Sequence, residues 1–213
     1  MAIEYKTNSF DILGRNIQLR VPADPNQLLE EAANNDDKDP YWGKVWNAAV
    51  PSAKCVLRTS WPTGTRALEL GCGTGLLGIA AQLAGLKLTF TDHVTDAVSL
   101  AVENAKANGF PESEGRLLDW HQDQNTPGIE TYPVLLASDV LYETSLHQAL
   151  LSCTDRILEP GGSLRIGDPG RENARAFLRL ANTQGWSFEL FDENLRQVGV
   201  PARAQFQWIV LRR

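Results

Sequence analysis

The chain contains, at positions 67–75, the sequence Ala67-Leu68-Glu69-Leu70-Gly71-Cys72-Gly73-Thr74-Gly75. The residues before Gly71 are typical of a short buried strand, and a helical pattern follows from Leu76 to Ala84 and stops at Gly85. A strand, a glycine-rich turn and a helix in this order begin a βαβ unit. The sequence therefore predicts an α/β sheet with a ligand site outside the carboxyl ends of its strands.

Short apolar runs continue to alternate with helical patterns after this unit. Further strands are predicted at 87–91, 115–118, 134–137 and 163–166, and helices at 95–108, 145–158 and after Asp168-Pro169-Gly170, with a turn at Pro160-Gly161-Gly162. Two last strands, at 186–191 and 206–211, have no helix-length pattern between them. We therefore expect a mostly parallel sheet that ends in an antiparallel hairpin.

The first 60 residues differ from the rest, because apolar residues are sparse and a polar run at 34–39 ends in Pro40. Residues 10–21 predict two short strands around Gly14, and a helix is expected from Trp42 to about Leu57. We expect this segment, 1–60, to pack on the same domain that 61–213 form.

Composition excludes several classes of protein. Among 213 residues, 43% are hydrophobic and the formal net charge is −6, which disfavours disorder and nonspecific nucleic-acid binding. No signal-peptide pattern or long apolar segment is present in the sequence, so a cytoplasmic location is expected. Three cysteines without a C-x-x-C pair, and three dispersed histidines, predict no disulfide framework and no metal site.

The details of the glycine turn separate the classes of nucleotide ligand. A dinucleotide-binding turn requires glycine where Leu76 stands, and a P-loop requires Lys and Ser or Thr where Ile79 and Ala80 stand. The turn is preceded by the acidic Glu69, and Asp92 ends the next strand. A carboxylate at that strand end can accept hydrogen bonds from both ribose hydroxyls, or it can cap the following helix.

The segment Leu68–Gly75 resembles the first motif of the seven-stranded (class I) S-adenosylmethionine-dependent methyltransferases. The resemblance implies a Rossmann-like, doubly wound seven-stranded sheet and S-adenosylmethionine as cofactor, with S-adenosylhomocysteine as product. It also implies that the glycine turn meets the methionine end, that Asp92 binds ribose and that Asp119 lies by the adenine. This cofactor has no phosphates, its carboxylate suits a helix N-terminus, and its ammonium and sulfonium suit acidic groups such as Glu69.

A narrower resemblance rests on three short motifs, Asp39–Trp46, Leu118–Trp120 and Ser138–Tyr142. Together they resemble the methyltransferase-like protein-lysine methyltransferases, particularly the branch with the electron-transfer-flavoprotein β-subunit lysine methyltransferase, which shares a turn like Asp168–Arg171. The resemblance implies that Asp139 and Tyr142 lie beside the substrate amine and that the first motif packs over the cofactor. Asn47 departs from the subgroup's Trp-Pro, which puts the position of the leading helix in doubt. The cofactor set implied by both resemblances is Trp46, Glu69, Gly71, Cys72, Gly73, Gly75, Asp92, His93, Asp119, Trp120 and Ser138.

The residues themselves leave alternatives open. In a helix Trp42 and Trp46 would share a face, so one of them could wall the pocket, with core packing as the other reading of Trp42. Asp139 ends a strand and faces the ligand crevice, or it caps the next helix. Tyr142 lies on the same side if that helix has begun, or it belongs to the scaffold. Arg171 is expected to be a solvated residue of a first helical turn rather than a binder of acidic substrate groups.

Two further residues of the implied cofactor-binding set, Cys72 and His93, also have interpretations without a functional role. No base positioned to activate Cys72 is identifiable, so it is expected to be a small filler residue rather than a nucleophile. His93 either touches the adenine or is an ordinary exposed histidine.

The function expected is N-methyl transfer to the side chain of a protein lysine. A small-molecule amine acceptor, and a cofactor-binding scaffold without turnover, remain as alternatives. Leu76 disfavours a nicotinamide-dependent oxidoreductase. A nucleic-acid or membrane partner is not expected, and the residues indicate no oligomeric state.

Overall fold

The computed structural model describes residues 3–24, 27–28, 40–122, 130–199 and 203–213. The helices and strands are, in chain order, β1 (Tyr5–Ile12), β2 (Arg15–Pro22), the 3-10 helix η1 (Tyr41–Gly43), α2 (Ala49–Arg58), β3 (Arg66–Leu70), α3 (Leu76–Leu83), β4 (Lys87–Asp92), α4 (Thr95–Ala107), β5 (Glu114–Leu117), β6 (Tyr132–Ser138), the 3-10 helix η3 (Thr144–Leu146), α5 (His147–Ile157), β7 (Leu158–Asp168), α6 (Glu172–Thr183), β8 (Ser187–Phe191), β9 (Gln197–Val198) and β10 (Gln207–Arg212).

The large sheet has the strand order β5-β4-β3-β6-β7-β10-β8-β9. The five neighbouring strands β5, β4, β3, β6 and β7 are parallel to one another. Strand β10 lies between β7 and β8 and is antiparallel to both. The predicted fold class, a mostly parallel α/β sheet with a final antiparallel hairpin, is confirmed. A strand of two residues, β9, adds an eighth strand at the edge.

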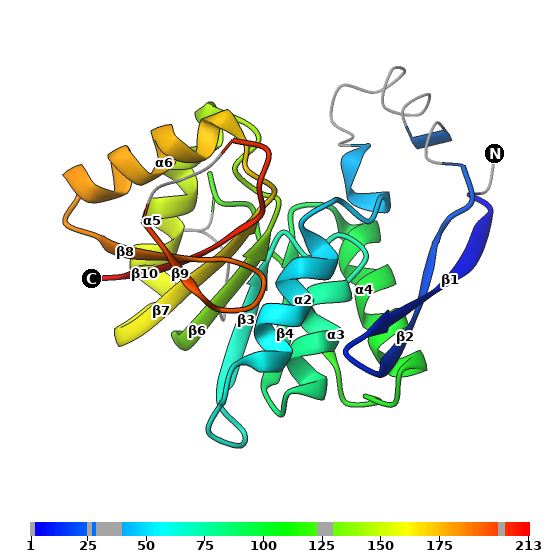
Figure 1. The fold of residues 1–213 in the computed structure, drawn as a ribbon. Coiled ribbons are helices and arrows are strands. Elements are labelled where there is room, and N and C mark those ends of the chain that lie inside the picture. The colour runs from blue at the N-terminus through cyan, green and yellow to red at the C-terminus, as the bar shows by residue number, and fades with distance from the viewer. Residues whose placement is uncertain (1–2, 25–26, 29–39, 123–129, 200–202) are drawn as a thin grey trace.

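Helices cover both faces of this sheet (Figure 1). Neighbouring strand residues point to opposite faces, so Ala67 packs with the residues of α2 and α3, whereas Leu68 packs with those of α5 and α6. Burial on both sides explains why the central strand β6 is almost continuously apolar, whereas β5 at the edge has the sequence Glu-Gly-Arg-Leu and is partly exposed. The helix-to-strand connections bring the carboxyl ends of β3, β4 and β6 to one edge.

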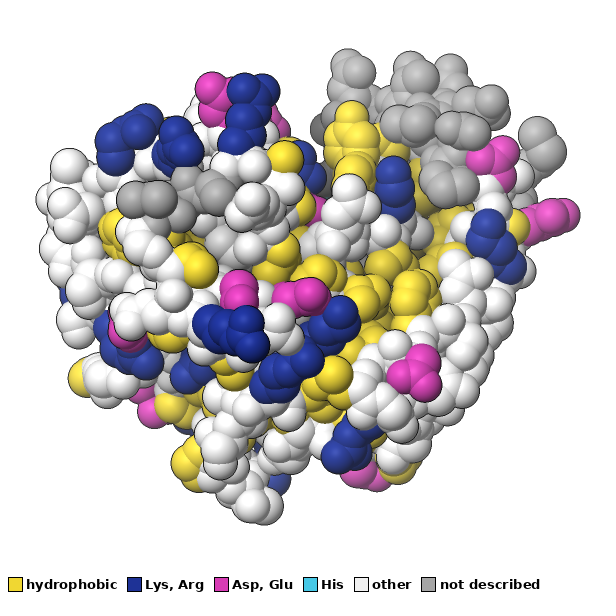
Figure 2. All heavy atoms as spheres, in the orientation of Figure 1, with side chains coloured by type: hydrophobic (Ala, Val, Ile, Leu, Met, Phe, Trp, Pro, Cys, Tyr) yellow, Lys and Arg dark blue, Asp and Glu magenta, His cyan; other side chains and the backbone are white. Residues whose placement is uncertain are grey.

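The amino-terminal strands β1 and β2 form a separate antiparallel hairpin that packs outside α3 and α4 (Figure 1). Two strands around Gly14 were predicted, and both are longer than expected. Hydrophobic side chains are visible along the seam between α2 and the hairpin (Figure 2). Asn104 of α4 accepts a hydrogen bond from the N–H of Arg20 at 2.8 Å and donates to its carbonyl at 3.0 Å. Asn108 binds the backbone of Gln18 in the same way. The two side-chain amides therefore form hydrogen bonds with β2 that a neighbouring strand would otherwise supply.

The predicted helix from Trp42 to Leu57 is wrong at its beginning. Only residues 41–43 form a 3-10 turn, Lys44 is extended, and α2 starts at Ala49. Pro51 explains the start, because a proline is tolerated in the first turn of a helix but breaks a helix interior. The polar run at 34–39 that precedes this segment lies outside the described residues.

Two smaller predictions also differ. The turn predicted at 160–162 is a bulge within β7, which runs from Leu158 to Asp168: β7 advances from Leu158 to Ser163 opposite Tyr132 and Val134, and Gly161 has a φ of 78°. The helix predicted from Ser145 is a 3-10 turn followed by α5, which begins at His147. Within the part of the chain that the structure describes, no helix is long and apolar enough to span a bilayer.

Candidate active site

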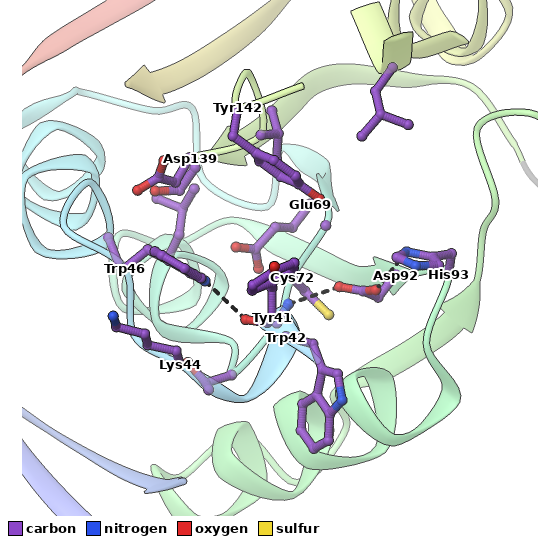
Figure 3. A pocket seen from close by; sticks show the side chains of 18 of the residues that line it. Tyr41, Trp42, Lys44, Trp46, Glu69, Cys72, Asp92, His93, Asp139 and Tyr142 are labelled. Carbon is purple, nitrogen blue, oxygen red and sulfur yellow. Dashed lines mark hydrogen bonds and ion pairs between the residues drawn. The ribbon is translucent and has the colours of Figure 1, made fainter. Parts of the chain in front are cut away.

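A cavity of about 390 Å³ opens at the carboxyl ends of β3, β4 and β6 (Figure 3). The predicted site residues that line it are Trp46, Glu69, Gly71, Cys72, Gly73, Asp92, His93, Asp119, Trp120, Ser138, Asp139 and Tyr142. Gly75 is outside the cavity, where it precedes α3 and packs against Ala101 of α4. The topology therefore brings together residues that are spread over almost one hundred positions of sequence.

The turn after β3 is built for a close approach between segments. Gly73 has a positive φ of 49°, and a Cβ there would lie 3.0 Å from the backbone oxygen of Trp42. The N–H of Cys72 donates to the carbonyl of Thr91 at 2.8 Å, which ties the turn to β4. Glycine at 73 is thus required by the backbone conformation and by the neighbouring segment.

Asp92 braces this turn from the end of β4. One carboxylate oxygen accepts a hydrogen bond from the N–H of Gly73 at 3.0 Å, and the other accepts one from the N–H of Val94 at 3.1 Å. The side chain is only 6% exposed, and Nδ1 of His93 lies 3.3 Å from it. Asp92 therefore faces the cavity and binds the backbone N–H of Val94 just before α4, while the helix itself has no side-chain cap.

Glu69 brings a buried carboxyl group to the floor of the cavity (Figure 3). Burial raises its pKa well above the usual range, and the nearby Asp92 acts in the same direction. Its Oε2 atom has no hydrogen-bond partner among the described residues. This oxygen is closed off from solvent and lies beside Gly78 of α3, whose backbone N–H acts to lower the pKa.

Cys72 has the properties of a filler residue rather than of a nucleophile. Its side chain is buried, and desolvation raises the pKa of the thiol well above the usual range, as do Asp92 and Glu69. A thiol that stays protonated cannot act as a thiolate nucleophile.

The side of the cavity near β5 is formed by Asp119 and Trp120. Asp119 accepts a hydrogen bond from the N–H of His121 at 2.9 Å, and the Trp120 ring lies close to Gly71. On the opposite side, the hydroxyl of Ser138 lies 3.1 Å from that of Ser52 in α2. These contacts hold both walls in place.

The two tryptophans of the leading segment point in different directions (Figure 3). Trp42 is buried in a small cluster with Leu28 and Leu100, whereas the Trp46 ring nitrogen donates to the carbonyl of Tyr41 at 2.9 Å. The expectation that they share a helix face is wrong, because residues 44–48 are not helical. Lys44 lies over the Trp46 ring at 4.7 Å, so a cation and an aromatic ring form this rim.

Asp139 follows β6 in a left-handed conformation, with a φ of 63°. Its N–H donates to the carbonyl of Gly167, and its side chain is 3% exposed. Oδ1 accepts a hydrogen bond from Nε of Arg171 at 2.6 Å and lies 2.5 Å from Nη2. The expectation of a solvated Arg171 is therefore wrong: the arginine reaches across from the start of α6 to hold this carboxylate.

The segment before α6 positions both residues of the Asp139-x-x-Tyr142 motif. Asp168 accepts hydrogen bonds from the N–H groups of Gly170 and Arg171, each at 2.8 Å, and burial raises its pKa. Asn173 donates to the carbonyl of Tyr142 at 2.7 Å. Tyr142 is not helical, yet it lines the cavity with Asp139. Sequence reasoning missed Arg171 and Asn173 as parts of the site, although the Asp168–Arg171 turn pointed to this place.

The charges of the cavity favour a cationic ligand. Five carboxyl groups line it, from Glu69, Asp92, Asp119, Asp139 and Glu143, and the only Lys or Arg among its lining residues is Lys44. The described residues include no group of three His, Cys, Asp or Glu side chains that could hold a metal ion. The buried Glu69 carboxyl group, the acidic lining and the close-packed glycine turn fit the ammonium, sulfonium and ribose of S-adenosylmethionine.

Comparisons with known proteins agree with this geometry. Residues 27–182 match the protein family described as lysine methyltransferase. The chain is 31% identical over 160 residues to the electron transfer flavoprotein beta subunit lysine methyltransferase of Danio rerio, covering 68% of this chain and 58% of that protein. It is 32% identical over 155 residues to EEF1A lysine methyltransferase 3 of Mus musculus, covering 69% and 65%. The chain thus spans less than two thirds of the length of these relatives.

A solved structure supports the fold. The N-methyltransferase NodS from Bradyrhizobium japonicum WM9, in complex with S-adenosyl-l-homocysteine, superposes with a TM-score of 0.61. The two chains are 18% identical, and the match covers 88% of this chain and 97% of NodS.

Proposed function

The chain belongs to the lysine methyltransferase family, and from this premise we propose that it transfers a methyl group from S-adenosylmethionine to the side-chain amine of a protein lysine. The observation that carries the proposal is the position of Asp139 and Tyr142. Both line the acidic cavity at the end of β6, next to the part that fits the cofactor. The net charge of −6 favours a protein or small-molecule acceptor over a nucleic acid.

The residues around the glycine turn would hold the cofactor. Asp92 would accept hydrogen bonds from the ribose hydroxyls, and Asp119 and Trp120 would lie by the adenine. Glu69 would face the ammonium group, and the N–H groups at the start of α3 would face the carboxylate. When bound, S-adenosylmethionine supplies a methyl group that a nitrogen lone pair takes up as the C–S bond breaks, with the electron pair of that bond staying on sulfur.

The protein must present a neutral amine, because an ammonium has no lone pair for the attack. A free lysine has a pKa of about 10.4 and is almost wholly charged at neutral pH. Burial of the amine lowers its pKa, and a path of water molecules can take the departing proton. Asp139 orients the amine and Tyr142 donates or accepts a hydrogen bond, so positioning supplies most of the rate enhancement.

Labelled S-adenosylmethionine and a host-cell lysate test the proposal. Purified protein is incubated with both, and protein, RNA and small-molecule fractions are resolved separately. We expect label in a protein band, on lysine by mass spectrometry, that is lost with Asp139→Ala and kept with Asp155→Ala. Asp155 is a matched control because it pairs with Arg213 on the surface of α5 and does not line the cavity.

Each other outcome contradicts part of the proposal. Label confined to small molecules would retain the transfer and exclude a protein acceptor. Cofactor binding without label in any fraction, in a lysate of cells that lack this protein, would indicate a scaffold without turnover.

A further inference from the structure

Arg171 contacts two residues of the site, Asp139 through its guanidinium nitrogens and Tyr142 through the aromatic ring. Its guanidinium holds Oδ1 of Asp139 with two nitrogens, yet Arg171 is not among the residues that line the cavity. The other oxygen, Oδ2, faces the backbone N–H of Ala48 at a long 3.5 Å. The carboxylate therefore has one oxygen committed to the arginine and one weakly bound oxygen, in a group that lines the cavity.

The turn at Asp168–Arg171 fixes the position of the Arg171 backbone. Asp168 binds the N–H groups of Gly170 and Arg171, and Gln207 of β10 donates to the same oxygen at 3.2 Å. Gly170 has a φ of 87°, and a Cβ there would lie 2.4 Å from the backbone nitrogen of Gln205. The Arg171 guanidinium also lies 5.8 Å from the centre of the Tyr142 ring. A turn held this tightly fixes where the guanidinium can reach.

Other charged and titratable groups line the same cavity or lie close to the Asp139–Arg171 pair. They are Tyr41 and Lys44 before α2, Glu69 of β3, Cys72 after it, Asp92 of β4, His93 after it, Asp119 and His121 after β5, Tyr142 and Glu143 after β6, His147 of α5 and Asp168 of β7. Lys44 is the only Lys or Arg in this set. Among the described residues, Arg171 is therefore the cation that contacts Asp139 directly.

A carboxylate beside an amine favours the ammonium form, and an adjacent cation offsets that effect. An uncompensated Asp139 would therefore bind the acceptor in the protonated state, which cannot attack. We propose that Arg171 is a positioning residue that offsets the charge of Asp139, so that an acceptor amine occupies the site in its neutral, reactive form. This inference rests on the proposed amine acceptor, and it adds the group that sets the protonation state of that amine.

The first test measures binding rather than turnover. n-Butylamine, which mimics a lysine side chain, is titrated into the protein with and without S-adenosylhomocysteine between pH 6.5 and 10, followed by NMR. The wild-type protein should bind the amine more tightly as pH rises, because it takes the neutral form. Arg171→Gln should bind it several-fold more tightly at pH 7 and depend less on pH, because it accepts the ammonium.

The second test measures transfer to lysate protein at saturating S-adenosylmethionine. In Arg171→Gln both KM and kcat should fall at pH 7, kcat by about tenfold, and the acid limb of kcat should move to higher pH by about one unit. Arg171→Lys keeps the charge and should restore the wild-type limb. Arg179→Ala removes an exposed arginine of the same helix and should leave the profile unchanged.

The outcomes separate this inference from the proposed function. If Arg171→Gln and Arg171→Lys lose transfer equally, with the wild-type pH dependence in both, Arg171 is only structural and the inference is overturned. Absence of n-butylamine binding to every variant would overturn it as well. If the wild-type protein labels no acceptor but binds n-butylamine, the proposed function is contradicted. The effect of Arg171 on the pH dependence of amine binding can still be measured in that case. Melting temperatures identify any variant that fails to fold.

Discussion

The two sides of the cavity are built in different ways. On the side proposed for the cofactor, a turn of adjacent residues and the end of the next strand meet through backbone hydrogen bonds, as in the contact from Gly73 to Asp92. On the side proposed for the acceptor, the Asp139 carboxylate is held by Arg171, which lies 32 positions later. Its other oxygen faces the backbone N–H of Ala48, which lies 91 positions earlier. The first side is local in sequence, and the second is an assembly of distant segments. Substitutions should therefore affect binding and transfer separately.

The largest effect is expected from Asp139→Ala. Loss of the group that orients the amine should lower transfer by about a thousandfold or more, since positioning carries most of the proposed catalysis. The dissociation constant for S-adenosylmethionine, measured by calorimetry, should change less than about threefold. A parallel loss of cofactor binding would show that the two sides are not separable.

Asp92→Ala is the converse experiment. It removes a carboxylate that binds the turn and faces the proposed ribose position, so the dissociation constant should rise by about 30-fold, in line with about 2 kcal/mol for charged hydrogen bonds. Transfer at saturating cofactor should fall far less. An unchanged dissociation constant would remove Asp92 from the cofactor site.

A matched pair on α4 tests whether the hairpin influences the cofactor side. Asn104 and Asn108 each clamp one residue of β2, but only Asn104 also donates to the carbonyl of Thr74 in the glycine turn, at 2.9 Å. Each change to alanine should lower the free energy of unfolding by about 2 kcal/mol in chemical denaturation. Only Asn104→Ala should also weaken cofactor binding. Equal effects on binding would mean that hairpin docking itself, rather than the Thr74 contact, is responsible.

The smallest effect concerns protons at Glu69. Because its pKa is raised in the folded protein, the carboxyl retains a proton above about pH 4.3, where the unfolded chain has lost it. An approaching ammonium favours the carboxylate, so cofactor binding should release a proton from Glu69 and should strengthen as pH rises above about 4.3 towards the raised pKa. Calorimetry in buffers of different ionisation enthalpy measures the release. Glu69→Gln should abolish both the release and the pH dependence.

Burial of the same group also predicts how stability depends on pH. The folded empty protein holds more protons than the unfolded chain above about pH 4.3, so the contribution of Glu69 to the free energy of unfolding decreases as pH rises through the window up to its raised pKa. Replacing the Glu69 carboxyl group with an uncharged amide should restore the free energy of unfolding that is lost as pH rises. Glu69→Gln should therefore be at least as stable as the wild-type protein at pH 7, while binding the cofactor less tightly.

The alternation of apolar residues was sufficient to predict the parallel strands, the final hairpin and the helices α3 and α4. Their limits differ from the predictions by one or two residues, except that β7 begins five residues before the predicted strand, because periodicity depends on which face is buried and not on where pairing stops. The leading helix failed for a local reason that was available in the sequence. Pro51 can stand in the first turn of α2 but not in the middle of a helix that starts at Trp42.

The sequence by itself determined the order of strands and helices, the glycine turn and the strand-end carboxylates, since these follow from side-chain period and local backbone conformation. Only the tertiary structure decided that Trp42 packs in a small core and also lines the cavity with Trp46, that Asn104 joins the hairpin to the glycine turn, and that Arg171 holds Asp139. Such contacts join segments far apart in the chain, and a local pattern carries no information about which distant partner a long polar side chain will reach.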